Sequence, residues 1–232
     1  MRCSMLNRMF SVLVIAFGAL LFLGCQKEQF NQVSAIHDGH SDEIQDDFES
    51  EPTVGEEASC RRATAAQIKV VNEGAAKKAK FVARCVAETN SQKSCDEVVR
   101  PNPDSSRSFD CTYSVEQSHV FVHPDESTWS NAITAVKTVQ LLESKGIKVE
   151  TIYDWWRPEP YNANVGGAAG RHPYGTSVDV RFPSKAEQNR AFAELCKLRS
   201  QGKIRAVGYY SGTGLHFGVG DKTANTRGKS CS

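Results

Sequence analysis

Residues 171–182 read RHPYGTSVDVRF and predict a turn followed by a β-strand. Polar and apolar side chains alternate from Ser177 to Phe182, a pattern typical of a half-buried β-strand. Gly175 allows a tight bend just before this strand. A loop can therefore present His172 while Asp179 enters on the strand that follows.

The sequence after this stretch predicts a helix and two further strands. Residues 184–187, Ser-Lys-Ala-Glu, have the pattern of a capping box and open a helix that runs to about Ser200. Two short strands, 204–210 and 215–219, follow it and are separated by a glycine-containing turn. The second of these strands contains His216.

The sequence before this stretch predicts more elements of the same kinds. Residues 118–123 alternate like a strand, the capping residues 125–127 open a helix that runs to about Ser144, and 147–153 form another strand. Helices and strands are mixed along the chain. The predicted fold class is therefore α+β, with helices packed on a small antiparallel sheet.

A helical extension precedes these elements. Residues 63–87 are rich in Ala, Lys, Gln and Glu with apolar residues at helical spacing, so 60–112 is predicted to be mostly helical. The turn-forming run 101–104, Pro-Asn-Pro-Asp, ends this pattern. The basic residues of 61–107 are compatible with an anionic wall polymer, but a solvated helix face is the simpler interpretation.

Two histidines and one aspartate have the chemistry of a zinc site. Zinc accepts imidazole nitrogen and carboxylate oxygen, and a catalytic site keeps three protein ligands and leaves the fourth position to water. His172, Asp179 and His216 satisfy this requirement, although a histidine near an aspartate is more often a simple polar pair. His119 and His123 are predicted to be surface positions of a strand.

Several motifs occur in order and resemble the zinc D-Ala-D-Ala carboxypeptidase family, whose fold hedgehog signalling domains share. The motifs are an arginine at a strand end, a Tyr-Asn-x-x-Val-Gly-Gly loop, His-x-x-Gly-x-x-x-Asp, and a late histidine on a glycine-flanked strand. The resemblance covers about Ser127 to Gly220. It implies a hedgehog-like or D,D-peptidase-like fold and one Zn²⁺ bound by His172, Asp179 and His216. It also implies hydrolysis next to D-amino acids in peptidoglycan stem peptides.

By the same resemblance, Arg157 faces the substrate or the transition-state oxyanion. A salt bridge from Arg157 to Asp154 or Glu159 is an equally good interpretation. The neighbouring Trp155 and Trp156 either line a cleft or belong to the core.

The sequence departs from the family where an acid takes the proton from the attacking water. Family members carry this acid three residues before the late histidine or two after it, and here Thr213 and Gly218 stand there. Neither residue can act as a general base. Asp221, Asp154 and Glu159 remain as substitutes, and Asp221 is retained as the candidate. A second departure, Gly170 in place of a serine, is milder.

Two functions therefore remain open. The first is a zinc metallopeptidase, an endopeptidase or a carboxypeptidase, that acts on peptidoglycan stem peptides. The second is a catalytically degenerate, zinc-containing lipoprotein that binds the wall or a partner. The bond cleaved and the oligomeric state are also left open. We expect no nucleic-acid partner, although the formal net charge of +1 by itself says little about partners.

The first 59 residues predict export and a lipid anchor. Residues 1–24 have a positive start and an apolar run too short for a comfortable membrane span, which is typical of a signal peptide. The run ends in Leu-Phe-Leu-Gly-Cys, which resembles the lipobox of bacterial lipoproteins and predicts lipidation of Cys25. An ordinary signal peptide with an incidental cysteine is the alternative. Residues 25–59 are acidic and predict a disordered tether. Gln26, by resemblance to sorted lipoproteins, predicts a periplasm-facing position at the outer membrane.

The exported part has an even number of cysteines, which predicts disulfides in an oxidising compartment. A thiolate metal site is the weaker alternative, because the chain has no Cys-x-x-Cys pair. The sequence cannot choose among the possible pairings. Residues 60–115 are thus a cysteine-containing helical extension, and 116–232 the zinc-peptidase-like domain. The candidate disulfide cysteines are Cys60, Cys85, Cys95, Cys111, Cys196 and Cys231.

Overall fold

A computed structural model describes residues 60–114, 119–220 and 226–231. The predicted signal peptide, Cys25, the acidic tether and Asp221 lie outside these residues. Among the described residues, no helix is both long enough and apolar enough to cross a membrane.

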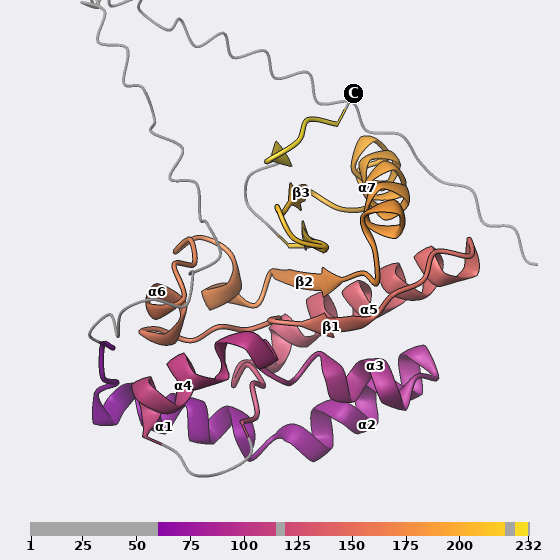
Figure 1. Ribbon diagram of the computed structural model, residues 1–232. Coiled ribbons are helices and arrows are strands. Elements are labelled where there is room, and N and C mark those ends of the chain that lie inside the picture. The colour runs from indigo at the N-terminus through magenta and orange to yellow at the C-terminus, as the bar shows by residue number, and fades with distance from the viewer. Residues whose placement is uncertain (1–59, 115–118, 221–225, 232) are drawn as a thin grey trace, which may run out of the picture. The chain divides into compact units, whose positions relative to one another are not determined.

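One sheet holds the strands, in the order β1-β2-β4-β3-β5 (Figure 1). The first four are β1 (Thr151–Tyr153), β2 (Ser177–Arg181), β4 (Gly214–Gly218) and β3 (Ala206–Tyr209), and their pairings are antiparallel. The two-residue β5 (Thr226–Arg227) is parallel to β3. The predicted α+β class with a small antiparallel sheet is confirmed. The register of β2 and β4 places Asp179 directly opposite His216.

Two long helices pack against this sheet. Helix α5 (Trp129–Ser144) follows the short η2 (Glu126–Thr128) and contacts β2, while α7 (Lys185–Ser200) contacts β3 and β4. The Ser184 side chain accepts a hydrogen bond from the Glu187 amide and so caps α7. Both predicted helices are confirmed. They could be predicted because their caps and stop residues are local signals.

The extension forms α1 (Ala65–Ala75), α2 (Lys78–Thr89), α3 (Gln92–Glu97), η1 (Pro103–Ser105) and α4 (Ser106–Tyr113). Figure 1 shows these helices on one side of β1 and β2. Helix α2 packs against α5, α3 against β1, and α4 against α6 (Tyr161–Asn164). The Phe81 ring lies 5.1 Å from the Trp155 ring and 5.4 Å from that of Trp129. The extension and the sheet therefore share one hydrophobic core.

The helices of the extension approach the rest of the chain closely near Gly74. A Cβ added to Gly74 would lie 1.9 Å from the carbonyl oxygen of Val122. Only glycine permits this contact between α1 and the segment that leads into α5.

The prediction of a strand over 118–123 is wrong for the described residues of this segment, 119–123, because they form no strand. Phe121 and Val122 are both buried, so the alternation does not separate an inner from an outer face. His119 is also not a surface position, because its side chain is 15% exposed and pairs with Asp110 at 2.7 Å. The strand predicted over 147–153 is shorter, at Thr151–Tyr153.

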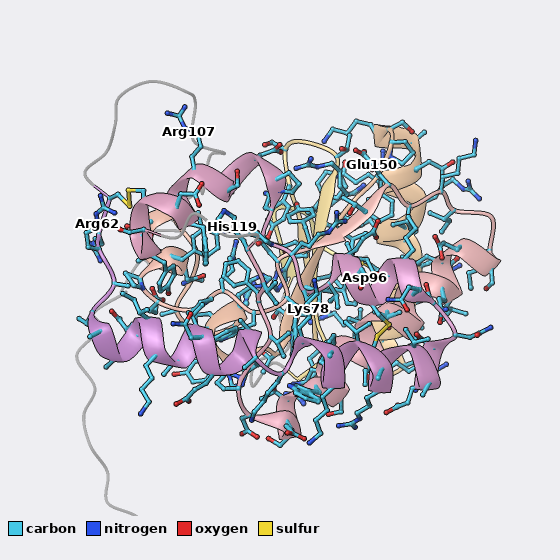
Figure 2. All side chains as sticks on the ribbon, turned by 90° about the horizontal axis from the view of Figure 1, so that it is seen from below. Arg62, Lys78, Asp96, Arg107, His119 and Glu150 are labelled. Atoms are coloured by element: carbon cyan, nitrogen blue, oxygen red, sulfur yellow. A yellow bond between two sulfur atoms is a disulfide. The ribbon has the colours of Figure 1, made fainter. Side chains whose placement is uncertain are left out.

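Three disulfides confirm the interpretation of the cysteines (Figure 2). Two of them lie within the extension, and the third ties α7 to the C-terminal residues. Their Cα–Cα distances of 5.4–5.9 Å fall in the usual range for disulfides. The pairs are Cys60–Cys111, Cys85–Cys95 and Cys196–Cys231.

Candidate metal centre

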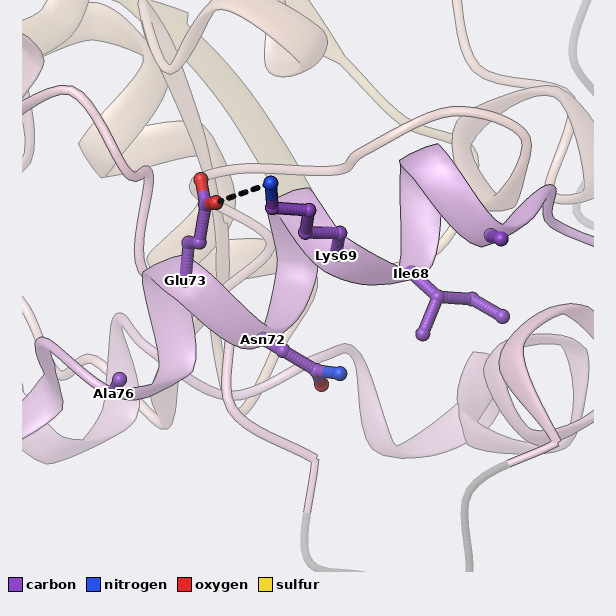
Figure 3. A pocket seen from close by; sticks show the side chains of 6 residues that line it. Ile68, Lys69, Asn72, Glu73 and Ala76 are labelled. Atoms are coloured by element: carbon purple, nitrogen blue, oxygen red, sulfur yellow. Dashed lines mark ion pairs between the residues drawn. The ribbon is translucent and has the colours of Figure 1, made fainter.

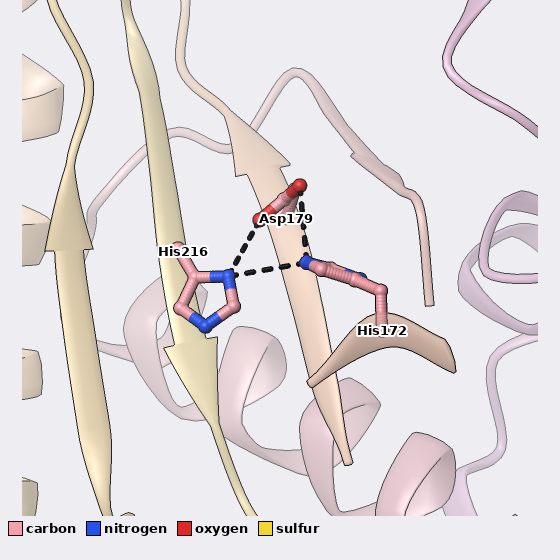
Figure 4. Close-up of side chains that lie close together, drawn as sticks. All are labelled: His172, Asp179 and His216. Carbon is pink, nitrogen blue, oxygen red and sulfur yellow. Dashed lines mark hydrogen bonds and ion pairs between the residues drawn. The ribbon is translucent and has the colours of Figure 1, made fainter. Parts of the chain in front are cut away.

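His172, Asp179 and His216 meet at one point of the structure, as Figure 4 shows. His172 lies in the short turn η3 (His172–Tyr174), Asp179 in β2 and His216 in β4. His172 Nε2 lies 3.2 Å from His216 Nδ1 and 3.4 Å from Asp179 Oδ2. His216 Nδ1 lies 3.0 Å from Asp179 Oδ1. We call these three residues the triad.

The triad has the spacing of a metal site. With zinc–ligand bonds of about 2.0–2.1 Å, the ligand atoms of a tetrahedral shell lie roughly 3.3 Å apart. The two ring nitrogens lie 3.2 Å apart, His216 Nδ1 lies 3.0 Å from Asp179 Oδ1, and His172 Nε2 lies 3.4 Å from the other carboxylate oxygen, Oδ2. All three side chains are buried, at 2–3% exposure. The triad could therefore hold a metal ion.

The protonation of His172 and Asp179 also suits a metal. Burial, with the charge of Arg157, lowers the pKa of His172 to about 4, so its imidazole is neutral near pH 7. Burial alone would raise the pKa of Asp179, but its pairing with His172 and His216 holds it well below its usual value. Neutral imidazoles and an ionised carboxylate are the forms that bind metals.

Outer contacts orient the ligand atoms. His172 Nδ1 lies 3.0 Å from the carbonyl oxygen of Trp155, which can only accept, so the Nε2 lone pair is left for a metal. The Tyr210 hydroxyl donates to Asp179 Oδ1 at 3.0 Å. Trp155 and Trp156 are both buried and belong to the core. The Trp155 and Trp156 indoles donate to the carbonyl oxygens of Gly175 and Pro173, and so brace the turn that carries His172.

Arg157 lies beside the triad. Its Nη1 is 3.8 Å from Asp179 Oδ2 and 3.5 Å from Asp154 Oδ2, and the residue is 9% exposed. Its backbone amide donates to the carbonyl oxygen of His172. Its buried Nε has no hydrogen-bond partner among the described residues. The predicted salt bridge to Asp154 is thus present, and Arg157 lies near the triad.

The candidate substitutes for the general base have other contacts. Both carboxylate oxygens of Glu159 are engaged at α6, by the Asn162 side chain and the Ala163 amide. Asp154 is buried and accepts from the Asn102 amide at 3.0 Å, and burial raises its pKa to about 6 against the lowering effect of Arg157. Gly218 pairs with Ser177 in the sheet and supplies no side chain. Among the described residues, Asp179 is the only acid in the group that could hold a metal.

Two contributors to this region, Asn102 and Tyr210, were not foreseen from the sequence. Asn102 reaches Asp154 from 52 positions away along the chain, and no local pattern marks such a contact. Tyr210 ends the first strand of a predicted hairpin, and its proximity to Asp179 depends on the pairing of three strands.

An open depression on α1 is separate from the triad (Figure 3). It is lined by α1 residues and Ala76, and the ion pair Lys69–Glu73, at 3.9 Å, lies on it. No triad residue contributes to it. The depression therefore adds nothing to the chemistry of the metal centre.

Comparison with known proteins assigns no family. No family model matches the chain, and neither a curated protein nor a solved structure matches it significantly.

Proposed function

We propose that this chain is a zinc-dependent peptidase of the D,D-peptidase and hedgehog-like fold, which hydrolyses bonds next to D-amino acids in peptidoglycan stem peptides. The observation that carries the proposal is the buried triad, in which the two histidine nitrogens lie 3.2 Å apart and each lies 3.0–3.4 Å from an oxygen of Asp179. The ordered motifs that resemble the zinc D-Ala-D-Ala carboxypeptidases give the substrate class.

The triad and Arg157 have separate roles. His172 Nε2, His216 Nδ1 and a carboxylate oxygen of Asp179 would hold the ion. A zinc ion in such a site supplies a Lewis acid and an activated water at neutral pH. Arg157 orients the substrate, because an arginine donates strong, charge-assisted hydrogen bonds to carbonyl and carboxylate oxygens.

The Arg157 Nε supports this role. A buried donor left without an acceptor costs free energy, and Nε has none among the described residues. A substrate oxygen at this position would remove the cost. Substrate binding would then be tightest when charge develops on that oxygen.

A second function is favoured by a specific observation. Thr213 and Gly218 stand where the family carries its acid, and Asp154 and Glu159 are engaged elsewhere. A protein that holds zinc without a general base would be a wall-binding or partner-binding module. Asp221 is the candidate acid that distinguishes the two functions.

The cellular setting is part of the proposal. The lipobox-like sequence at Cys25 would attach the protein to the outer membrane, facing the periplasm, and residues 25–59 would give it reach across to the wall. The three disulfides are in keeping with such an oxidising compartment.

A digestion experiment tests the proposal. The oxidised full chain is incubated with purified peptidoglycan, with zinc and with a chelator, and the released muropeptides are compared. We expect zinc-dependent cleavage that His216→Ala abolishes and Asp221→Asn reduces. Unchanged muropeptides from a protein that holds one equivalent of zinc would reject the peptidase and leave the binding module.

A further inference from the structure

Asp154 lies between the extension and the triad. It directly follows β1, is 1% exposed, and has a backbone φ of 49°. This left-handed conformation is disfavoured for a residue with a Cβ, although aspartate tolerates it better than most. Contacts on both sides of the carboxylate must therefore hold it in place.

Each oxygen of Asp154 faces a different part of the protein. Oδ1 accepts a hydrogen bond from the Asn102 amide of the extension, at 3.0 Å. Oδ2 faces the Arg157 guanidinium, 3.5 Å from Nη1. Asp154 thus connects the extension to the arginine that lies beside the triad.

Asn102 is itself held in place, in part by Arg181 of β2, the strand that carries Asp179. Its Oδ1 accepts from the Asp104 amide at 3.1 Å and faces Arg181 Nη2 at 3.4 Å. Arg181 also pairs with the Asp104 carboxylate. Because Arg181 ends β2, the contacts from Asp179 through Arg157, Asp154 and Asn102 return to the same strand.

Arg157 stands between two carboxylates. Its Nη1 is 3.5 Å from Asp154 Oδ2 and 3.8 Å from Asp179 Oδ2, and that second oxygen is also 3.4 Å from His172 Nε2. A metal ion in the triad and the guanidinium therefore compete for the Asp179 carboxylate. The second anion at Nη1, Asp154, decides how strongly the guanidinium competes.

We infer that Asp154 is a positioning residue that restrains Arg157 from Asp179, and that the extension sets metal affinity by holding Asp154 through the Asn102 amide. This inference rests on the proposed zinc site. Asp154 also neutralises Arg157 beside a dication. Without it, two positive centres would face each other in a buried, weakly screened environment.

The first test is a double-mutant cycle on zinc affinity. The full chain is titrated with zinc against a chromophoric chelator of known affinity. We expect Asp154→Asn to weaken zinc binding about tenfold, as is typical when an outer-shell partner of a ligand is lost. We expect Asp154→Asn with Arg157→Met to recover most of that loss, because the competing cation is gone.

Either of two results would overturn the inference. One is an Asp154→Asn variant that binds zinc as tightly as the wild type. The other is an affinity loss that stays undiminished in the double variant, since it would then come from general damage to the fold and not from Arg157.

The second test isolates the amide of Asn102. Asn102 has a φ of −58°, which proline adopts, so Asn102→Pro removes the N–H without forcing a new backbone angle. Asn102→Ala loses the same side chain but keeps the N–H, and is the matched control. We expect zinc affinity to fall several-fold further in the proline variant than in the alanine variant. Equal affinities would overturn the role of the extension.

These affinities separate the inference from the function on which it rests. A wild type that binds no zinc overturns both. A wild type that binds zinc and cleaves nothing rejects the peptidase only, and the affinities of the variants still decide the inference.

Discussion

Replacing Asp154 with asparagine should make the stability of the protein depend differently on pH. Burial raises the pKa of Asp154 from 3.8 to about 6 in the folded chain, although Arg157 acts in the opposite direction. A carboxyl with a raised pKa favours folding while it is protonated, and that contribution is lost as the pH rises through the folded pKa. The asparagine side chain does not ionise, so the variant would be free of this loss.

The magnitude follows from the two pKa values. They differ by about 2, and each pKa unit is worth about 1.36 kcal/mol, so ionisation of buried Asp154 costs about 3 kcal/mol in total. About 2 kcal/mol of this cost appears between about pH 4.5 and about pH 7.5. The stability of the asparagine variant relative to wild type should therefore improve by about 2 kcal/mol over that interval.

Urea unfolding of both proteins, with disulfides intact and a chelator present, measures this difference. His172 has the opposite effect on how stability depends on pH. Its pKa is lowered to about 4 in the folded protein, so as the pH falls the unfolded chain takes up a proton first, and this destabilises the fold. Both proteins contain His172, so its effect largely cancels in the comparison. A stability difference that stays constant with pH, or shrinks as the pH rises, would show that Asp154 does not ionise at a cost to the fold.

Three further predictions use the same proteins and assays. Gly74→Ala should destabilise the fold by about 1–3 kcal/mol, because a backbone oxygen lies 1.9 Å from the new Cβ; Gly170→Ala, with nothing within 4 Å, is the control in the same denaturation series. Replacing both Cys196 and Cys231 with serine should cost about 2–4 kcal/mol in urea unfolding, and a change below measurement error would contradict it. Tyr210→Phe should weaken zinc binding about tenfold in the chelator competition, because Asp179 loses a donor at 3.0 Å.

Elements with local signals could be predicted from the sequence. The helix Lys185–Ser200 begins after a capping serine and ends just before a glycine with a φ of 70°, and both signals lie within or beside the helix's own sequence. The segment 119–123 could not be predicted in the same way. Its alternating pattern is that of a strand, but the extension packs over it and buries consecutive residues.

The site, too, could be predicted only in part. The type of residue at His172, Asp179 and His216 suggests zinc, and the resemblance places the three together, but only the pairing of β2 with β4 brings Asp179 opposite His216. The even cysteine count predicted disulfides, whereas the pairs depend on the folded chain. The contact of Asn102 with Asp154 joins distant parts of the sequence and has no local signal.

Metal content is the most direct test of the proposed zinc site. The full chain, purified oxidised without added metal or chelator, is analysed for elements alongside His216→Ala, with circular dichroism to verify that the variant is folded. We predict one equivalent of zinc in the wild type and almost none in the variant. A folded wild type without zinc, or a variant that retains the full equivalent, would rule out a zinc site at the triad.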